Sequence, residues 1–346
     1  MALERWSVLA LLRFFLASIV AVNHLAEYTA LGMFAFIPKL GAFEAILGFL
    51  LISGYSVTVS YLHSPEHFLR RRLFRLYPVY AASVLLTAGV SVYLSEQELP
   101  SLGYLAANLL FLNQLVTQTS FVGPAWSLSL EFWLYCLLPL IVGLKPLNAR
   151  LLVYLSFAAY VVYTAMRSLL HLPYYSGVGF GLNLVLLAFI WICGLRLAQS
   201  NVSQKAVLLD IRLLFWGHMV IAMLIQFGHR VKQNAAWQFL NDDVPDYFLE
   251  CVTLFLVYQG FRYVLSDAAK NNPPSRSMRT LGDISYPLYL VHIPVFVVAA
   301  KLGITSPILF FGAAMLFSYL IYAVFDVYSK RRDRPRTNRP MGALGS

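Results

Sequence analysis

Ten apolar stretches, separated by short polar segments, constrain this chain more than any other feature of its sequence. A helix needs about 17 to 25 apolar residues to cross ~30 Å of hydrocarbon, and backbone groups in lipid must pair within their own segment. The stretches therefore predict an all-α polytopic membrane protein with about ten transmembrane helices. The predicted spans are 7–27, 43–62, 77–95, 128–144, 151–170, 178–198, 208–228, 247–265, 285–302 and 306–328.

Composition separates the chain from soluble proteins and from nucleic-acid binders. It is 59% hydrophobic and 12% charged, whereas soluble domains carry roughly 25% charged residues. The net charge of +10 would suggest nucleic acid as the partner of a soluble protein. Here the basic residues cluster between apolar stretches, so we predict contact with the lipid bilayer and no nucleic acid.

The distribution of basic residues predicts the topology. An even number of spans places both termini on one side, and 20 of the 26 Lys and Arg residues lie on that side. Five lie on the opposite side, and Arg13 lies within a span. Because basic segments stay in the cytoplasm, both termini are predicted to be cytoplasmic.

The remaining segments suggest a single domain. Residues 1–330 show no internal repeat and are predicted to form one membrane domain, followed by a basic, disordered tail at 331–346. The amphipathic segment 102–116 is predicted to lie in the interface or to re-enter the membrane. The segment 229–246 is predicted to be an external loop. The three cysteines are predicted to be buried thiols, and no metal-ligand spacing occurs.

Arg13 and His24 are unusual residues for the first span. An arginine in lipid is costly and is by default functional or paired. Eleven helical residues at about 100° each bring His24 to within about 20° of the direction of Arg13, about 16 Å further along the helix. The two side chains are therefore predicted to share one face. The alternative is that Arg13 reaches the headgroups and His24 lies at the opposite interface.

Two neighbouring segments admit both a structural and a binding interpretation. The small residues Gly48, Ser53 and Gly54 fit close helix packing, and they also fit a narrow passage for a thin ligand. The run from Arg70 to Arg75 contains four arginines. Guanidinium groups favour phosphates, such as those of coenzyme A, but they also bind anionic lipid.

Glu131 follows the segment Gly123-Pro-Ala-Trp126-Ser127-Leu-Ser129-Leu and lies inside the fourth span. We predict that it lies at the depth of His24, where a carboxylate can orient a general base. A carboxylate that only joins two helices is the alternative. In the ninth span, His292 is interpreted either as a residue of a ligand pathway or as a histidine satisfied in the core.

Taken in order, these segments resemble the acyltransferase-3 family of integral membrane acyltransferases, over residues 1–330. The resemblance rests on Arg13 and His24, on 49–55, on 69–78, on 123–131 and on 281–292. Members of this family acylate hydroxyl groups, most often those of surface glycans, in bacterial membranes. One departure is Asp326-Val-Tyr in the last span, where the family often has Glu-x-Pro.

The resemblance implies an O-acyltransferase of the bacterial inner membrane, active in cell-envelope polysaccharide modification. Acyl-CoA, most simply acetyl-CoA, would be the co-substrate, with no permanently bound cofactor and no metal, and a glycan or glycolipid would be the acceptor. The implied residues fall into three groups. The catalytic residues are His24 as general base, Glu131 and Arg13; the acyl-CoA site comprises Arg71, Arg72, Arg75, Ser53 and Gly54; the acceptor site comprises Trp126, Ser127, Ser129, Tyr286 and His292.

Other functions remain as alternatives at this stage. A glycolipid transporter or flippase would also explain charges inside the membrane, although transporters often show repeated halves. A scaffold for glycan synthesis would leave Arg13 and Glu131 without a role. Within the enzyme interpretation, direct transfer competes with a mechanism in which His24 is itself acylated. The oligomeric state is left open.

Overall fold

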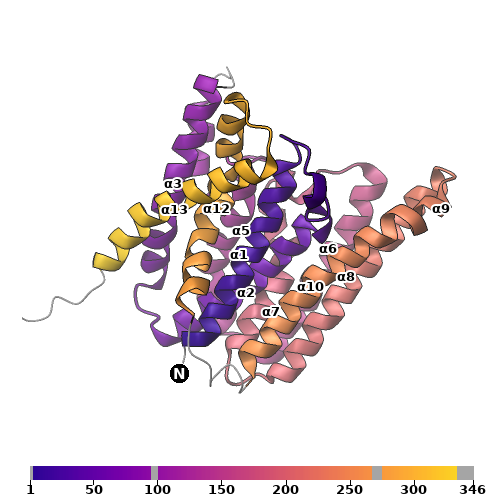
Figure 1. The fold of residues 1–346 in the computed structure, drawn as a ribbon. Helices are drawn as coiled ribbons and strands as arrows, with labels where there is room; N and C mark the ends of the chain where they lie inside the picture. The colour runs from indigo at the N-terminus through magenta and orange to yellow at the C-terminus, as the bar shows by residue number, and fades with distance from the viewer. Residues whose placement is uncertain (1–2, 95–99, 267–274, 333–346) are drawn as a thin grey trace, which may run out of the picture.

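The computed structural model describes residues 3–94, 100–266 and 275–332 (Figure 1). Ten long helices account for most of this part of the chain. They are α1 (Leu3–Leu25), α2 (Ala42–His63), α3 (Phe68–Leu94), α5 (Trp126–Val142), α6 (Pro146–Leu170), α7 (Leu182–Ala198), α8 (Gln204–Lys232), α10 (Val244–Leu265), α12 (Arg276–Lys301) and α13 (Pro307–Arg332). The shorter elements are the α-helices α4 (Leu102–Leu109) and α9 (Ala236–Gln238), the 3-10 helices η1 (Gly32–Phe34), η2 (Pro38–Leu40), η3 (Gly123–Ala125) and η4 (Tyr175–Gly177), and the π-helix η5 (Phe239–Asp243).

Each predicted span falls on one of these ten helices, which confirms the all-α polytopic fold. Within the described residues, nine helices are long and apolar enough to cross a membrane, and α7 is a shorter apolar helix. The end of the third span and the tail 333–346 include residues outside the described part of the chain. Two helices begin well before their predicted spans, which start at 77 and 285. α3 begins at Phe68 and α12 at Arg276, because arginines and their neighbours continue the helix beyond the apolar stretch.

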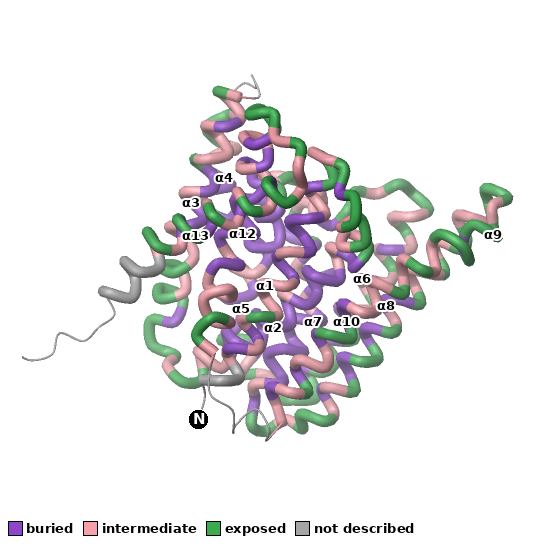
Figure 2. Tube along the Cα trace, viewed as in Figure 1, coloured by how far each residue is buried: buried purple, intermediate pink, exposed green. Residues whose placement is uncertain are grey.

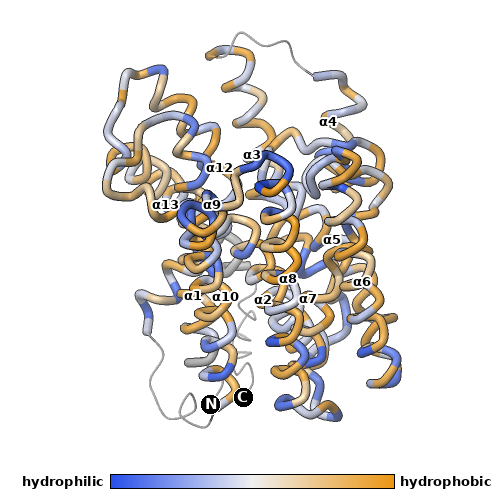
Figure 3. Tube along the Cα trace, turned by 90° about the vertical axis from the view of Figure 1, so that its right-hand side faces the viewer, coloured by the Kyte–Doolittle hydropathy of each residue, from blue (hydrophilic) through white to orange (hydrophobic). Residues whose placement is uncertain are grey.

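The helices form a buried centre and a lipid-facing periphery. α1 packs on α12, and α2 packs on α7, so buried residues concentrate in the middle of the bundle (Figure 2). The most apolar window of α2 is 72% buried, whereas that of α13 is only 17% buried. Large apolar side chains on peripheral helices are exposed, for example Leu85, Leu155, Leu224 and Leu309. Hydrophobic residues run along the lengths of the helices (Figure 3), as a lipid environment requires.

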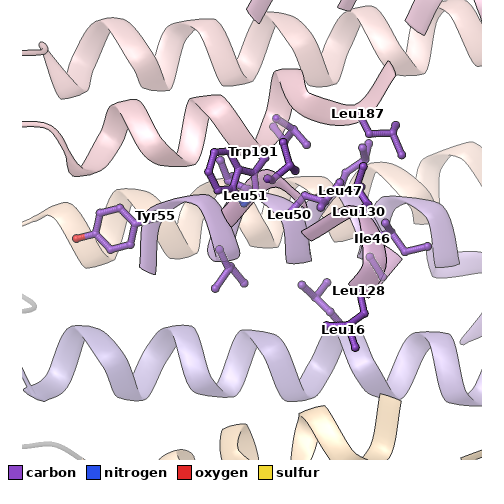
Figure 4. Close-up of a cluster of buried hydrophobic side chains, with 14 of the residues drawn as sticks. Leu16, Ile46, Leu47, Leu50, Leu51, Tyr55, Leu128, Leu130, Leu187 and Trp191 are labelled. Carbon is purple, nitrogen blue, oxygen red and sulfur yellow. The ribbon is translucent and has the colours of Figure 1, made fainter. Parts of the chain in front are cut away.

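The α2–α7 contact forms the centre of the core (Figure 4). A Cβ on Gly54 would lie 2.0 Å from the carbonyl oxygen of Trp191, and a Cβ on Gly194 would lie 2.2 Å from that of Leu51. Glycine at both positions lets the two backbones touch. Of the two interpretations of Gly54, the structure supports helix packing. Its lack of a side chain serves this contact and not a passage for ligand.

The segment 229–246 is not the loop that the sequence suggested. α8 continues to Lys232, and a helical turn resumes at Ala236, so only three residues separate the helices. α8 and α10 run side by side to the tip that carries α9 (Figure 1). The acidic residues are used internally, because Asp243 accepts hydrogen bonds from Arg230 at 2.7 and 2.9 Å.

The segment after α4 folds back into the protein without forming a separate long helix, as predicted for 102–116. Its polar side chains Asn108, Asn113 and Gln114 are buried. Asn108 accepts a hydrogen bond from the amide of Phe121 at 2.9 Å, and the Gln114 amide donates to Ser176 O at 2.7 Å. Side chains thus satisfy irregular backbone away from lipid. This segment leads into η3 and α5.

Candidate active site

A cavity of about 1050 Å³ lies between α1, α2, α3, α5 and α12. We name it the arginine cavity, because four arginines of α3 and Arg13 of α1 line it. Its polar lining is completed by hydroxyl and carboxyl groups. These are Ser53, Ser56, Ser60, Ser127, Glu131, Tyr135, Asp283, Ser285, Tyr286, Tyr289 and Tyr322.

A second cavity, of about 980 Å³, lies between the ends of α1, α2, α6, α8 and α10. We name it the histidine cavity, because four histidines line it. Both aromatic and charged side chains line it. The lining includes Asn23, His24, Phe43, Glu44, Trp126, Tyr160, Arg167, His171, Tyr174, Tyr175, His218, His229, Glu250 and Tyr289.

Tyr289 of α12 lines both cavities. Its hydroxyl lies 2.7 Å from that of Ser127, and its ring packs edge-on against Phe49 with the centroids 5.4 Å apart. The two cavities therefore meet at one tyrosine ring held from α5 and α2.

Arg13 is held by hydrogen bonding at the wall of the arginine cavity. Its guanidinium donates to the hydroxyl of Ser56 at 2.6 Å, and that hydroxyl donates to the carbonyl of Ile52 at 2.8 Å. Arg13 therefore points into the protein and not toward lipid headgroups. The structure thus favours the pairing interpretation of the first span over the snorkelling one.

The four α3 arginines make three kinds of contact. Arg71 donates to the carbonyls of Glu66 and Ser64, which ties the α2–α3 turn to the helix. Arg75 lies 3.9 Å from Asp283 of α12. Arg70 and Arg72 lie over phenylalanine rings of their own helix, at 5.5 and 5.9 Å from the ring centroids. The guanidinium groups of α3 thus line one wall of the cavity.

His24 pairs with His292. The Nδ1 atom of His24 lies 3.1 Å from Nε2 of His292, and the two rings stack with centroids 5.1 Å apart. Nδ1 of His292 lies 2.8 Å from the carbonyl oxygen of Leu288. His292 is completely buried and lines neither cavity, whereas His24 lines the histidine cavity.

Glu131 does not lie at the depth of His24. Ser127 of α5 and Tyr289 of α12 are in contact and mark a common level. Glu131 lies four residues from Ser127 along α5. His292 lies three residues from Tyr289 along α12, on the side away from Glu131. Seven residues of helical rise separate the two levels by about 10 Å. The prediction of a shared depth was therefore wrong: Glu131 lines the arginine cavity with Arg13, and His24 lines the histidine cavity.

Glu131 has partners in the arginine cavity instead. Its Oε2 accepts a hydrogen bond of 2.7 Å from the hydroxyl of Tyr135. Because the proton of Tyr135 is used there, Ser53 must donate to Tyr135 across their 2.9 Å contact. This network joins α2 to α5 beside Arg13.

The other predicted site residues are divided between the two cavities, and one lines neither. Ser127 and Tyr286 line the arginine cavity, and Trp126 lines the histidine cavity. The hydroxyl of Tyr286 donates to Leu76 O at 2.9 Å, which joins α12 to α3. Ser129 lines neither cavity and lies 2.7 Å from the carbonyl oxygens of both Phe111 and Asn113.

Sequence reasoning missed a second buried histidine contact. His218 Nε2 of α8 lies 2.8 Å from Glu44 Oε1 of α2, and its Nδ1 lies 2.7 Å from the hydroxyl of Tyr160. Glu44 is a carboxylate in the first turn of a predicted span, and that alone was a signal of function or pairing. Its partner, 174 residues away, had no signal in the sequence. Tyr135 and Tyr289 were missed because tyrosine is common in apolar spans.

Comparison with known proteins identifies the family. The profile of the acyltransferase-3 family, described as an acyltransferase domain, matches residues 6–327. No curated protein and no solved structure matches the chain. The matched region contains both cavities and nearly every described helix. With its lipid-facing apolar helices, the chain is a transmembrane acyltransferase and belongs to the acyltransferase-3 family.

Proposed function

We propose that the protein transfers an acyl group from cytoplasmic acyl-CoA, most simply acetyl-CoA, to a hydroxyl of an extracytoplasmic glycan or glycolipid. One observation carries the proposal. A cavity lined by arginines and a cavity lined by His24 meet at Tyr289, so a donor and an acceptor can approach one point from opposite sides.

Membrane orientation follows from charge. With 20 of the 26 basic residues on the side of the termini, the arginine cavity opens toward the cytoplasm of a bacterial inner membrane and the histidine cavity opens outside. The acceptor then stays outside, and only the acyl group crosses.

The donor binds in the arginine cavity. Arg70, Arg72 and Arg75 attract the phosphates of coenzyme A, since guanidinium forks bind phosphate oxygens strongly. Arg71 shapes the wall through its bonds to the α2–α3 turn. An extended pantetheine arm of about 15–20 Å, estimated as for an extended chain, brings the thioester past Arg13 toward Tyr289.

Hydrogen bonding selects one nitrogen of His24 as the base. The carbonyl of Leu288 can only accept, so Nδ1 of His292 carries the proton and its Nε2 accepts. His24 therefore donates its Nδ1–H to His292. In the neutral imidazole the remaining Nε2 of His24 is then unprotonated. His292 thus acts as a positioning residue that prepares His24 to take a proton.

The reaction is direct acyl transfer. Nε2 of His24 takes the proton of the acceptor hydroxyl, whose oxygen attacks the thioester carbonyl carbon. The new C–O ester bond forms, the C–S bond breaks, and the proton passes to the departing thiolate, which releases CoA-SH. The hydroxyls of Ser127 and Tyr289 are hydrogen-bonded to each other at 2.7 Å, so one of the two can turn its proton to the carbonyl oxygen as negative charge develops.

Release of free CoA from acetyl-CoA by the purified protein tests this function. CoA release should require a glycan acceptor, and His24→Ala should lower the rate by about 10²–10⁴-fold, the usual contribution of a general base. His63→Ala, an exposed histidine at the end of α2, is the matched control and should keep the wild-type rate. Full turnover by His24→Ala would refute the assignment. Labelled acyl-His24 trapped without acceptor would replace direct transfer by an acyl-enzyme.

A further inference from the structure

Arg167 is the unexplained charge of the histidine cavity. It lies in the last turn of α6 and lines the cavity. Its guanidinium lies 5.2 Å from the ring centroid of Tyr174 and 5.8 Å from that of Tyr175. Its buried Nε has no hydrogen-bond partner, and no carboxylate forms an ion pair with it among the described residues.

Two other cations at this end of the molecule are paired with carboxylates, unlike Arg167. Arg230 is paired with Asp243 at 2.7 Å, and Lys39 is paired with Asp246 at 2.8 Å. Arg167 instead rests on two aromatic faces, which position a cation without neutralising it. A guanidinium held in this way at the wall of a cavity keeps its donors available for an anion.

The carboxylates of the same cavity lie together on another wall, and one of them is paired. Glu44 is paired with His218 at 2.8 Å, and His218 also contacts the hydroxyl of Tyr160. Glu250 lies beside Glu44, because a Cβ built on Gly41 would meet Glu44 Oε2 at 2.0 Å and Glu250 Cγ at 3.0 Å. The cavity is therefore polarised, with two carboxylates gathered where α2 meets α10 and a cation on α6.

The surroundings of Arg167 fit an anionic sugar. Ser168, its neighbour on α6, lies 2.7 Å from Nε2 of His229, and His171 follows at the end of the same helix. All three side chains line the cavity. The Ser168–His229 pair uses one of its two donors internally and keeps the other for an anion, and His171 adds a further donor. The rings of Phe43 and Tyr175 stack on each other with their centroids 4.9 Å apart and form an apolar wall of the cavity beside these donors.

We propose that Arg167 binds an anionic group of the acceptor, a carboxylate or a phosphate carried on or next to the sugar whose hydroxyl is acylated. This inference rests on the proposed function and adds the charge class of the acceptor to it. Arg167 holds the anion at one wall of the histidine cavity, and the sugar extends from there toward His24.

Fractionated native acceptor tests the proposal. Surface glycans of cells that carry the protein are separated by anion exchange into neutral and acidic pools. Each pool is offered to the purified protein with radiolabelled acetyl-CoA in a non-ionic detergent. The label should enter the acidic pool. Arg167→Gln should raise KM for that pool about tenfold with little change in kcat, as expected when one charged hydrogen bond is lost.

Two variants control for charge and folding. Arg167→Lys keeps the charge but not the fork and should recover part of the KM. Lys232→Gln removes an exposed charge from the last turn of α8 and should leave KM unchanged. Equal labelling of the neutral pool, or an unchanged KM in Arg167→Gln, would overturn the inference while leaving the proposed function standing.

Two further outcomes separate the remaining explanations. If the KM effect of Arg167→Gln appears only in phosphatidylglycerol nanodiscs and not in detergent, Arg167 binds a lipid headgroup, and the acceptor need not be anionic. If neither pool is labelled by the wild-type protein, the proposed function itself fails, and this inference fails with it.

Discussion

The imidazole of His24 shows how strongly single contacts determine chemistry in this protein. Its partner His292 is buried and linked to the backbone of its own helix at Leu288. His292, which the sequence suggested as a residue of a ligand pathway, thus lines neither cavity and contacts His24 instead. The same distinction applies to Ser129, whose hydroxyl is used by backbone carbonyls.

Substitution of His292 tests the positioning role at the residue scale. His292→Phe removes the acceptor for His24 Nδ1–H, so kcat should fall about tenfold, the equivalent of one hydrogen bond of about 1.4 kcal/mol. His292→Gln offers a carbonyl oxygen to the same N–H and should recover part of the rate. Steady-state kinetics and the pH profile of kcat are the measurements. Equal activity of His292→Phe and wild type would remove His292 from the mechanism.

At the scale of elements, the contact between α2 and α7 decides where the cavities can form. Gly54 and Gly194 bring the two backbones together, and this contact fixes the face of α2 that carries Ser53 and Ser56. A second set of contacts ties α6, α7 and α8. The buried carboxylate of Asp210 lies 2.8 Å from Arg150 and 2.7 Å from Arg196.

Gly54→Ala should destabilise the protein by about 1–3 kcal/mol, because an added methyl group forces the two helices apart. Thermal unfolding in detergent measures the effect. Gly89→Ala in α3 is the matched control, since a Cβ there meets no atom within 4 Å. The control should be neutral or slightly stabilising, as alanine favours a helix over glycine. Equal unfolding temperatures for the two variants would contradict the close contact.

At the scale of the whole molecule, Tyr289 is the residue that lines both cavities. The ring is held by Ser127 of α5 and by Phe49 of α2. Under the proposed function, the ring would keep water in the histidine cavity away from a thioester in the arginine cavity until the acceptor has bound. Three helices, α2, α5 and α12, therefore determine the position of this ring between the cavities.

Tyr289→Ala should join the cavities and allow water to reach the thioester. We expect acyl-CoA hydrolysis without acceptor to rise above the wild-type rate while transfer to acceptor falls. Tyr289→Phe keeps the ring and loses only the hydroxyl, so its hydrolysis rate should stay low. Free CoA released with and without acceptor distinguishes the two activities. A hydrolysis rate in Tyr289→Ala that matches wild type would show that the ring is not the barrier.

The sequence by itself determined the spans, the family resemblance and the shared face of Arg13 and His24. These depend on apolar length, residue pattern and helical period, all of which are local properties of the chain. Only the tertiary structure decided which side chains meet. His24 pairs with a residue 268 positions away, and Glu44 with one 174 positions away.

The depth of Glu131 is the clearest case of the difference. Its position within α5 is a matter of sequence, but its level relative to His24 depends on how far the segment before η3 folds into the protein. Buried polar side chains such as Asn108 and Gln114 fix that depth through contacts with distant backbone. Because such contacts follow from packing and not from periodicity, no local pattern in the chain could have predicted them.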